Sequence, residues 1–169
     1  MAIRVGIALG ANLGKRLSNL REARDMLRGL VDPESHYLQA PIYQSQPVDC
    51  ASDAPDFFNT VIEIDYIGEP YELLKMTQGV EFRLGRAAVH GFNVPREIDV
   101  DILYYDGVMM NEELLTIPHP RMLERRFVLQ PLSDIRPNLV LPGDEVSIRE
   151  HYAHLDSGEP PLRLVQSVW

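Results

Sequence analysis

The chain has 169 residues, a length that suits a single domain over residues 1–169 with a hydrophobic core of its own. A hydrophobic fraction of 45% and a charged fraction of 24% are typical of a folded globular protein and exclude the fibrous, disordered and membrane-embedded classes. The 25 acidic and 16 basic side chains give a net charge of −9, which repels nucleic-acid backbones and anionic lipid and disfavours both as partners.

The first part of the chain predicts two strands separated by a helix. Residues Ile3–Leu9 alternate as in a buried strand and form too short an apolar run for a signal sequence. Apolar residues at helical spacing predict a helix over Arg16–Leu30. A second strand is expected over His36–Gln44. The proline-, aspartate- and serine-rich stretch Ser45–Asp56 is expected to be a long exposed loop.

The second part repeats this alternation of strand and helix. Alternating residues predict a strand over Phe57–Tyr66, and Gly68-Glu69-Pro70 predicts the start of a helix that ends at Gly85. The remaining expected elements are a loop over Arg86–Pro95, a strand over Glu97–Tyr105, a loop over Thr116–Arg121, a short helix near Met122–Leu132 and proline-punctuated turns to the end. The resulting order, βαββαβ with C-terminal additions, is typical of an α+β sandwich whose helices cover one face of an antiparallel sheet.

The segment Pro95–Leu103 carries two carboxylates, Asp99 and Asp101, in a predicted strand. Alternate strand residues share a face, so both carboxylates point the same way while Val100 and Ile102 point into the core. Like charges this close are unfavourable unless a cation lies between them or one is protonated. Mg²⁺ commonly takes one or two carboxylates, with water and nucleotide phosphates as its other ligands. The pair is therefore a candidate Mg²⁺ site; two solvated surface carboxylates are the alternative.

Basic side chains gather near this segment and in a second one that follows it. Guanidinium groups bind phosphate oxygens bidentately and stay charged at physiological pH. Arg86, Arg96, His119 and Arg125 would form a cradle for a triphosphate if they lay near the two carboxylates. Taken singly, each arginine has the alternative role of a surface salt-bridge partner.

Residues 95–103 resemble the P-R-x-x-D-[LIV]-D-[LIVM]-[LIVM] signature of the 6-hydroxymethyl-7,8-dihydropterin pyrophosphokinase family. The resemblance covers nearly the whole chain. Further similar segments are, in chain order, Ala8–Leu13, Tyr43–Pro47, Pro55–Asn59, Gln78–Arg86, Thr116–Pro120 and Arg125–Leu132. No short segment is decisive alone, but their order and spacing are very specific.

The resemblance implies a ferredoxin-like α+β fold and an enzyme of folate biosynthesis. In that reaction ATP gives its β,γ-pyrophosphate to the hydroxymethyl group of the pterin, and AMP is released. The implied catalytic residues are Asp99, Asp101, Arg86 and Arg96, with the two aspartates as ligands of two Mg²⁺ ions. The implied ATP-binding residues are Gln78, Glu81, Arg86, Arg96, Ile102, His119 and Arg125.

The resemblance also places the pterin ring near Ser45, Val48, Phe57, Asn59 and Phe127. A side-chain amide such as Asn59 matches the donors and acceptors on the pterin's amide edge, and the two phenylalanines would stack on the flat ring. Core packing is the alternative for both phenylalanines. Asn59 is harder to explain as a core residue, because asparagine is depleted in the middle of strands.

One segment departs from the family pattern. Positions 88, 89 and 92 are basic in many relatives, which also carry a tryptophan in this segment, whereas here they are Ala, Val and Phe. Fewer cationic contacts to ATP predict a higher KM for ATP with turnover retained, because the metal aspartates are present.

Two other functions fit the same composition. One is a relative with the same fold that binds pterin or nucleotide without catalysis, and an assay for AMP release separates it from the enzyme. The other is a βαββαβ regulatory module unrelated to ATP, which a Mg·ATP titration without binding would favour. For the pyrophosphokinase, the expected partners are ATP and the hydroxymethyl dihydropterin, bound by a monomer. The single Cys50 agrees with a cytoplasmic location.

Overall fold

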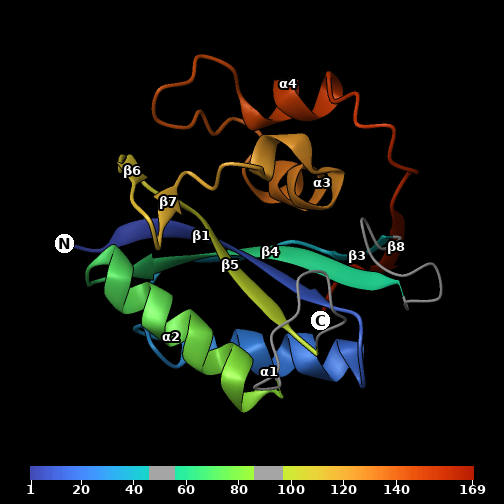
Figure 1. Cartoon of the computed structure of the whole chain (residues 1–169). Coiled ribbons are helices and arrows are strands. Elements are labelled where there is room, and N and C mark those ends of the chain that lie inside the picture. Colours follow the sequence, from blue (N-terminus) through green and yellow to red (C-terminus); the bar gives the residue numbers. More distant parts are fainter. Residues whose placement is uncertain (46–55, 86–96) are drawn as a thin grey trace.

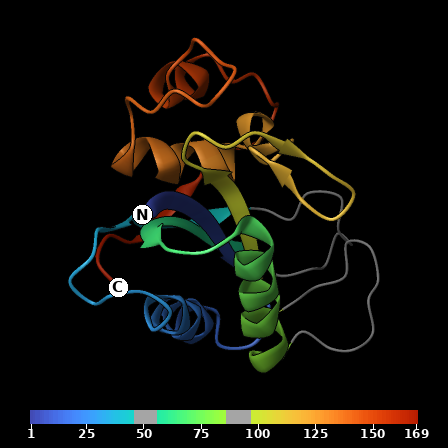
Figure 2. The ribbon, with the colours of Figure 1, turned by 90° about the vertical axis from the view of Figure 1, so that its left-hand side faces the viewer.

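A computed structural model describes residues 1–45, 56–85 and 97–169. In these ranges helices cover both faces of an antiparallel sheet (Figure 1 and Figure 2). The elements are, in chain order, β1 (Ile3–Ala11), α1 (Arg16–Arg28), β2 (Tyr37–Gln39), β3 (Ile42–Ser45), β4 (Phe57–Tyr66), α2 (Pro70–Arg83), β5 (Asp99–Tyr105), β6 (Met110–Asn111), β7 (Thr116–Ile117), the 3-10 helix η1 (Met122–Glu124), α3 (Arg126–Ile135), α4 (Ile148–Ala153) and β8 (Arg163–Gln166).

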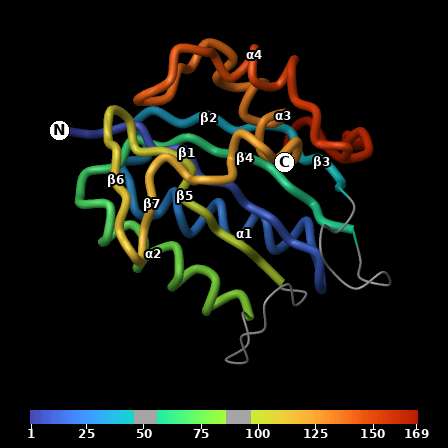
Figure 3. Tube along the Cα trace, turned by 45° about the horizontal axis from the view of Figure 1, so that its top comes forward, coloured from blue at the N-terminus to red at the C-terminus, as the bar shows by residue number. Residues whose placement is uncertain are grey.

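The main sheet has the strand order β5-β1-β4-β3-β8, and β2 also pairs with β4. β1 is antiparallel to both of its neighbours, β4 and β5, and the three strands run side by side through the middle of the molecule (Figure 3). β5 thus lies beside β1 although α2 and the preceding strands separate them in sequence. This order places the beginning of β5 against the end of β1.

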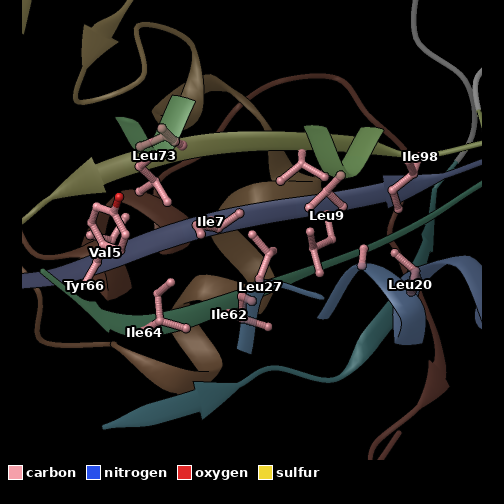
Figure 4. Close-up of a cluster of buried hydrophobic side chains, with 14 of the residues drawn as sticks. Val5, Ile7, Leu9, Leu20, Leu27, Ile62, Ile64, Tyr66, Leu73 and Ile98 are labelled. Carbon is pink, nitrogen blue, oxygen red and sulfur yellow. The ribbon is translucent and has the colours of Figure 1, made fainter. Parts of the chain in front are cut away.

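The first hydrophobic core lies between the sheet and the helices α1 and α2. Val5, Ile7 and Leu9 alternate along β1 and pack with Leu20 and Leu27 of α1 (Figure 4). Each of these side chains is at most 1% exposed. Burying an aliphatic side chain of this size contributes about 1.5–3 kcal/mol, so the alternation along β1 holds α1 against the sheet.

Local sequence signals determine where α2 begins and ends. The N–H of Glu69 donates to the Glu72 carboxylate at 3.0 Å, and Pro70 occupies the first turn, where a missing N–H has no cost. Gly85, just past the helix, has φ +94°, a conformation that other residues rarely adopt. The predicted limits of this helix are confirmed.

A second hydrophobic core lies on the opposite face of the sheet, under α3. Val61 of β4 packs with Leu129 and Leu132 of α3 and with Ile148 of α4. The sequence predicted helices on one face only. That prediction was wrong, because the apolar residues of α3 and α4 are buried against the other face as a second layer (Figure 1). Its strongest sequence signal, the apolar stripe of α3, falls within the helix predicted near Met122–Leu132.

An irregularity in β5 supplies the second core with two consecutive side chains. The pairing of β5 with β1 shifts by one residue between Tyr104, opposite Gly6, and Ile102, opposite Ile7. The extra residue, Leu103, therefore lies in the second core together with Tyr104. From Asp99 to Ile102 successive side chains point to opposite faces of the sheet, whereas Leu103 and Tyr104 both point to the second core.

Several predicted elements differ from the structure. The loop expected over Thr116–Arg121 begins with the short strand β7, and the helix expected near Met122–Leu132 is divided into η1 and α3. The strand expected over His36–Gln44 is divided into β2 and β3, because Pro41 has no N–H to donate to the ladder. The expectation of turns alone toward the end of the chain was wrong, since α4 and β8 form there. Most of the two predicted loops, 46–55 and 86–96, lies outside the described residues.

None of the helices in the described ranges has both the length and the apolar character that crossing a bilayer requires.

Candidate functional site

The candidate site begins with a row of residues across the three central strands. Asn59 of β4 lies opposite Gly10 of β1, and Gly10 in turn lies opposite Asp99 of β5. Because neighbouring strands are about 4.8 Å apart, Asn59 and Asp99 are about 10 Å apart across the glycine. A Cβ on Gly10 would meet the Asn59 Oδ1 at 3.0 Å. The missing side chain therefore leaves room between the amide and the carboxylate.

Asn59 is held in place by the neighbouring strand β3. The residue is 5% exposed, and its side-chain amide donates through Nδ2 to the Ser45 hydroxyl at 2.6 Å. The geometry leaves the Asn59 Oδ1 oriented toward Gly10. The structure thus brings together two of the predicted pterin-binding residues.

The two phenylalanines expected to stack on the pterin come from different elements. Phe57, half-buried at the start of β4, lies opposite Ser45, and its ring comes within 3.8 Å of where a Cβ on Gly10 would be. Phe127 is half-buried in the first turn of α3 and packs at the margin of the second core. Neither ring is fully buried, so each keeps an accessible surface.

Side chains along β5 alternate between the two faces of the sheet as expected, with Asp99 and Asp101 on the same face. Asp99 is half-buried and Asp101 is exposed, whereas Val100 and Ile102, 4% and 5% exposed, belong to the first core beneath the sheet. Opposite Asp101 on β1 is Ala8, again a small residue. Both carboxylates therefore lie on the face that carries Asn59.

The two carboxylates offer the oxygen ligands that Mg²⁺ prefers. Among the described residues, no group of three or more His, Cys, Asp and Glu side chains could enclose a metal ion. A cation held here by Asp99 and Asp101 would take its other ligands from water and from a bound phosphate chain. That combination of ligands is the usual one for Mg²⁺ at nucleotide sites.

Arg125 brings a positive charge to the same region. Its guanidinium lies over the Phe127 ring, 5.5 Å from the ring centre. Burial, and after it the charge of Arg121, lowers the pKa of Arg125, while the charge of Asp101 acts in the opposite direction. Arg125 is thus close enough to Asp101 for the two charges to interact.

His119 is a neutral side chain next to Arg125. Burial lowers its pKa to about 4, with further contributions from the charges of Arg125 and Arg121. The His119 Nδ1 accepts a hydrogen bond from the backbone N–H of Arg121 at 3.1 Å, so the ring proton is on Nε2. The backbone N–H of His119 donates to the Leu103 carbonyl at 2.7 Å, which fixes this loop to β5. His119 can therefore donate one hydrogen bond to an anion without carrying a charge.

The predicted nucleotide-side residues lie around the α2–β5 contact. Gln78 is exposed on α2, whereas Glu81 is 4% exposed and accepts a hydrogen bond from the backbone N–H of Val100 at 3.4 Å. Because the side chain of Ile102 belongs to the first core, its main chain is the part left to contact a ligand. The structure thus places Gln78 and Glu81 away from the face that carries the two aspartates. Three further predicted residues, Val48, Arg86 and Arg96, lie outside the described residues.

A buried polar network that the sequence did not reveal holds α3 on the sheet. Glu63 of β4 is completely buried and accepts hydrogen bonds from Tyr104 and Arg136, each at 2.5 Å; its other oxygen is 2.7 Å from the His36 Nε2. Burial raises the pKa of Glu63, but these hydrogen bonds and the charge of Arg136 outweigh it and lower the pKa below its usual value. Arg136 immediately follows α3, so the network fixes the end of the helix opposite to Arg125 and Phe127. A polar residue within a buried strand was the only sequence signal for it.

A second contact holds the same helix to β3. The Tyr43 hydroxyl donates to the Asp134 carboxylate at 2.5 Å, and burial together with this hydrogen bond raises the pKa of Tyr43 to about 12. Tyr43 lies opposite Asn59 in the sheet. α3 is therefore tied to the strand that adjoins the row of site residues.

Comparison with known proteins identifies relatives of this chain. The family model described as 7,8-dihydro-6-hydroxymethylpterin-pyrophosphokinase matches residues 6–137. A Bacillus subtilis protein named 2-amino-4-hydroxy-6-hydroxymethyldihydropteridine pyrophosphokinase is 40% identical over 129 residues, covering 76% of this chain and 75% of that protein. The folic acid synthesis protein fol1 of Pneumocystis carinii is 39% identical over 150 residues, covering 88% of this chain but 20% of that protein.

Solved structures share the fold at low sequence identity. The crystal structure of wild-type Plasmodium falciparum HPPK-DHPS with pteroate has a TM-score of 0.65 and 12% identity, covering 90% of this chain and 44% of that one. A structure of HPPK-DHPS in complex with substrates gives a TM-score of 0.65 at 14% identity. This chain spans 20% to 25% of the length of the folate-synthesis proteins of Pneumocystis carinii, Dictyostelium discoideum and Pisum sativum that it matches.

Proposed function

Because the chain belongs to the 7,8-dihydro-6-hydroxymethylpterin-pyrophosphokinase family, we propose that it transfers pyrophosphate from ATP to the hydroxymethyl group of 6-hydroxymethyl-7,8-dihydropterin. The hydroxyl oxygen attacks the β-phosphorus of ATP, the bond between the α,β-bridging oxygen and the β-phosphorus breaks, and AMP leaves. The hydroxyl proton is lost to solvent or to a nearby carboxylate. The product is the pyrophosphate ester needed for folate biosynthesis.

One observation carries the proposal: the row Asn59–Gly10–Asp99 places a fixed amide and a carboxylate on either side of a position without a side chain. Asn59, supported by Ser45, would read the amide edge of the pterin. Phe57 and Phe127 would stack on its two sides, and main-chain groups near Ser45 and Val48 would add hydrogen bonds. The pterin would then extend its hydroxymethyl group toward β5.

At the other end of the row, Asp99 and Asp101 would hold two Mg²⁺ ions. Such ions would supply positive charge that offsets the negative charge developing on the phosphates. Arg125 and the neutral His119 would bind phosphate oxygens, with Arg86 and Arg96 as further phosphate contacts. Because β5 is the edge strand of the sheet, a nucleotide bound at this edge could meet Gln78, Glu81 and the main chain of Ile102 as well as the aspartates on the other face. Little covalent chemistry is left to the protein, so these residues act by positioning and by stabilising charge.

The strand order, with β5 next to β1 and β4 between β1 and β3, supports assigning the fold to the ferredoxin-like class. We also propose that the described chain acts as a monomer on its two small-molecule substrates.

The decisive experiment measures AMP formation by chromatography after incubation with Mg·ATP and 6-hydroxymethyl-7,8-dihydropterin. We expect AMP in equal amount to the pyrophosphorylated pterin, and none without the pterin or with excess chelator. Binding of both substrates without AMP would instead identify a non-catalytic relative. Absence of Mg·ATP binding would overturn the nucleotide assignment altogether.

A further inference from the structure

The first turn of α3 is capped by a residue from far along the chain. α3 has no acidic residue in its first turn, and Arg125, at the position preceding the helix, makes no side-chain capping bond. The Glu159 carboxylate instead accepts a hydrogen bond from the backbone N–H of Arg126 at 3.1 Å. A carboxylate in this position satisfies an otherwise unpaired helix N–H and interacts favourably with the helix dipole.

Glu159 is itself presented by a tight turn. Gly158, just before it, has φ +68°, which favours glycine. The backbone N–H of Glu159 donates to the Ser157 hydroxyl at 3.3 Å. The turn therefore directs the Glu159 carboxylate at α3 and limits the ways in which it can move.

The capped residue lies between two members of the candidate site. Arg126 separates Arg125 from Phe127, and fixing its backbone fixes the starting point of the Arg125 side chain. Phe127 has a second support, because its ring packs at the margin of the second core. The Arg125 guanidinium lies outside that core, over the Phe127 ring, so its position follows the first turn of α3 that the cap helps to hold.

Glu159 also contributes charge at this place. The negative charges of Asp101, Glu124 and Glu159 all favour the charged form of Arg125. Carboxylates of the candidate metal-binding strand, of η1 and of the turn at Glu159 thus act by charge on this guanidinium.

We propose that Glu159 is a positioning residue for ATP: by capping α3 at Arg126, it holds Arg125 where a phosphate oxygen would bind. This inference rests on the proposed function, in which Arg125 contacts the phosphates. It assigns a role in the nucleotide site to the segment beyond α4, which the sequence left without one.

The test compares Glu159→Ala, which removes the cap, with Glu159→Gln, which keeps an acceptor oxygen and removes the charge. Loss of a helix cap is expected to raise the KM for ATP and the Kd for Mg·ATP roughly threefold to tenfold in Glu159→Ala. Glu159→Gln should stay within about twofold of the unaltered chain, since it still accepts from the Arg126 N–H. The KM for the pterin should not change, because core packing holds Phe127.

A double-variant cycle tests whether Glu159 acts through Arg125. In the Arg125→Gln background, Glu159→Ala should have no further effect on the KM for ATP. Glu113→Ala, which removes an exposed carboxylate from the turn between β6 and β7, controls for the change in net charge.

An unchanged KM for ATP in Glu159→Ala, an equal loss in Glu159→Gln, or an undiminished effect without the Arg125 guanidinium would each overturn the inference. If the unaltered chain forms AMP and Glu159→Ala matches it, only the inference fails. If the unaltered chain neither forms AMP nor binds Mg·ATP, the proposed function and the inference fail together.

Discussion

The ring of Tyr104 lies directly over Gly6, its neighbour across the sheet. A Cβ on Gly6 would come within 2.2 Å of the Tyr104 Cε1, closer than any real contact. The glycine lets the ring cross β1, so that the hydroxyl of a β5 residue reaches Glu63 on β4. A single missing side chain thus permits the buried network that fixes the end of α3.

This relationship predicts that Gly6→Ala is strongly destabilising. The added methyl group must displace the Tyr104 ring, which both strains the core and breaks its hydrogen bond to Glu63. We expect a loss of about 2–4 kcal/mol in the free energy of unfolding, measured by urea denaturation. Gly79→Ala is the matched control, since a Cβ on this exposed α2 residue meets nothing within 4 Å. It should be up to about 1 kcal/mol more stable than the unaltered chain, and equal effects of the two substitutions would refute the explanation.

Glu63 predicts a characteristic dependence of stability on pH. Its pKa in the folded chain is lower than the usual 4.5, so its stabilising contribution is present above that value. The contribution is lost as the pH falls from about 4.5 through the lowered pKa, because protonation then favours the unfolded chain. Glu63→Gln should cost about 3–5 kcal/mol at pH 7, since the charge of Arg136 loses its partner.

Urea denaturation at pH values from 7 to 3 would show this as a narrowing difference between Glu63→Gln and the unaltered chain. Glu113→Gln, an exposed carboxylate, should leave the pH dependence as it is. A difference that stays constant over the whole pH range would mean that the Glu63 carboxylate has no lowered pKa.

The candidate metal pair predicts loss of turnover without loss of the fold. Asp99→Asn and Asp101→Asn each remove a charged oxygen ligand from β5 and should lower kcat at least about a hundredfold. Circular dichroism and the unfolding midpoint should stay close to those of the unaltered chain, since neither aspartate belongs to the two cores. Asp106→Asn, at the exposed position after β5, should keep full activity. Near-normal turnover in either Asp99→Asn or Asp101→Asn would remove that aspartate from the metal site.

His119 predicts a distinct signature in nuclear magnetic resonance. Long-range ¹H–¹⁵N spectra should show a neutral ring with the proton on Nε2 at pH 7 and a titration midpoint of about 4. Arg125→Gln should raise the pKa of His119, because a nearby positive charge then no longer disfavours the charged ring, although burial still lowers it. His154, on the exposed surface, is the internal reference in the same spectra. A His119 midpoint that does not change in Arg125→Gln would show that the two side chains are not close.

Much of the candidate site could be predicted because its signals are local. The alternation of Asp99 and Asp101 with Val100 and Ile102 follows from strand geometry alone, and the structure confirms which of these side chains enter the core. The limits of α2 followed from Glu69, Pro70 and Gly85 in the same way. The segments that resemble the pyrophosphokinase family then indicated which strands and loops contain the catalytic and substrate-binding residues.

Only the tertiary structure showed which side chains that are far apart in the sequence contact one another. Glu63 meets His36, Tyr104 and Arg136 across separations of 27, 41 and 73 residues, and Glu159 meets Arg126 across 33. Periodicity determines which face of a strand or helix is buried, but not which side chains become neighbours when the elements pack. The sequence by itself therefore determined the family, the central strands and the carboxylate pair. The packing of α3 on the sheet decided what surrounds them, because its polar contacts form only between segments that the fold brings together.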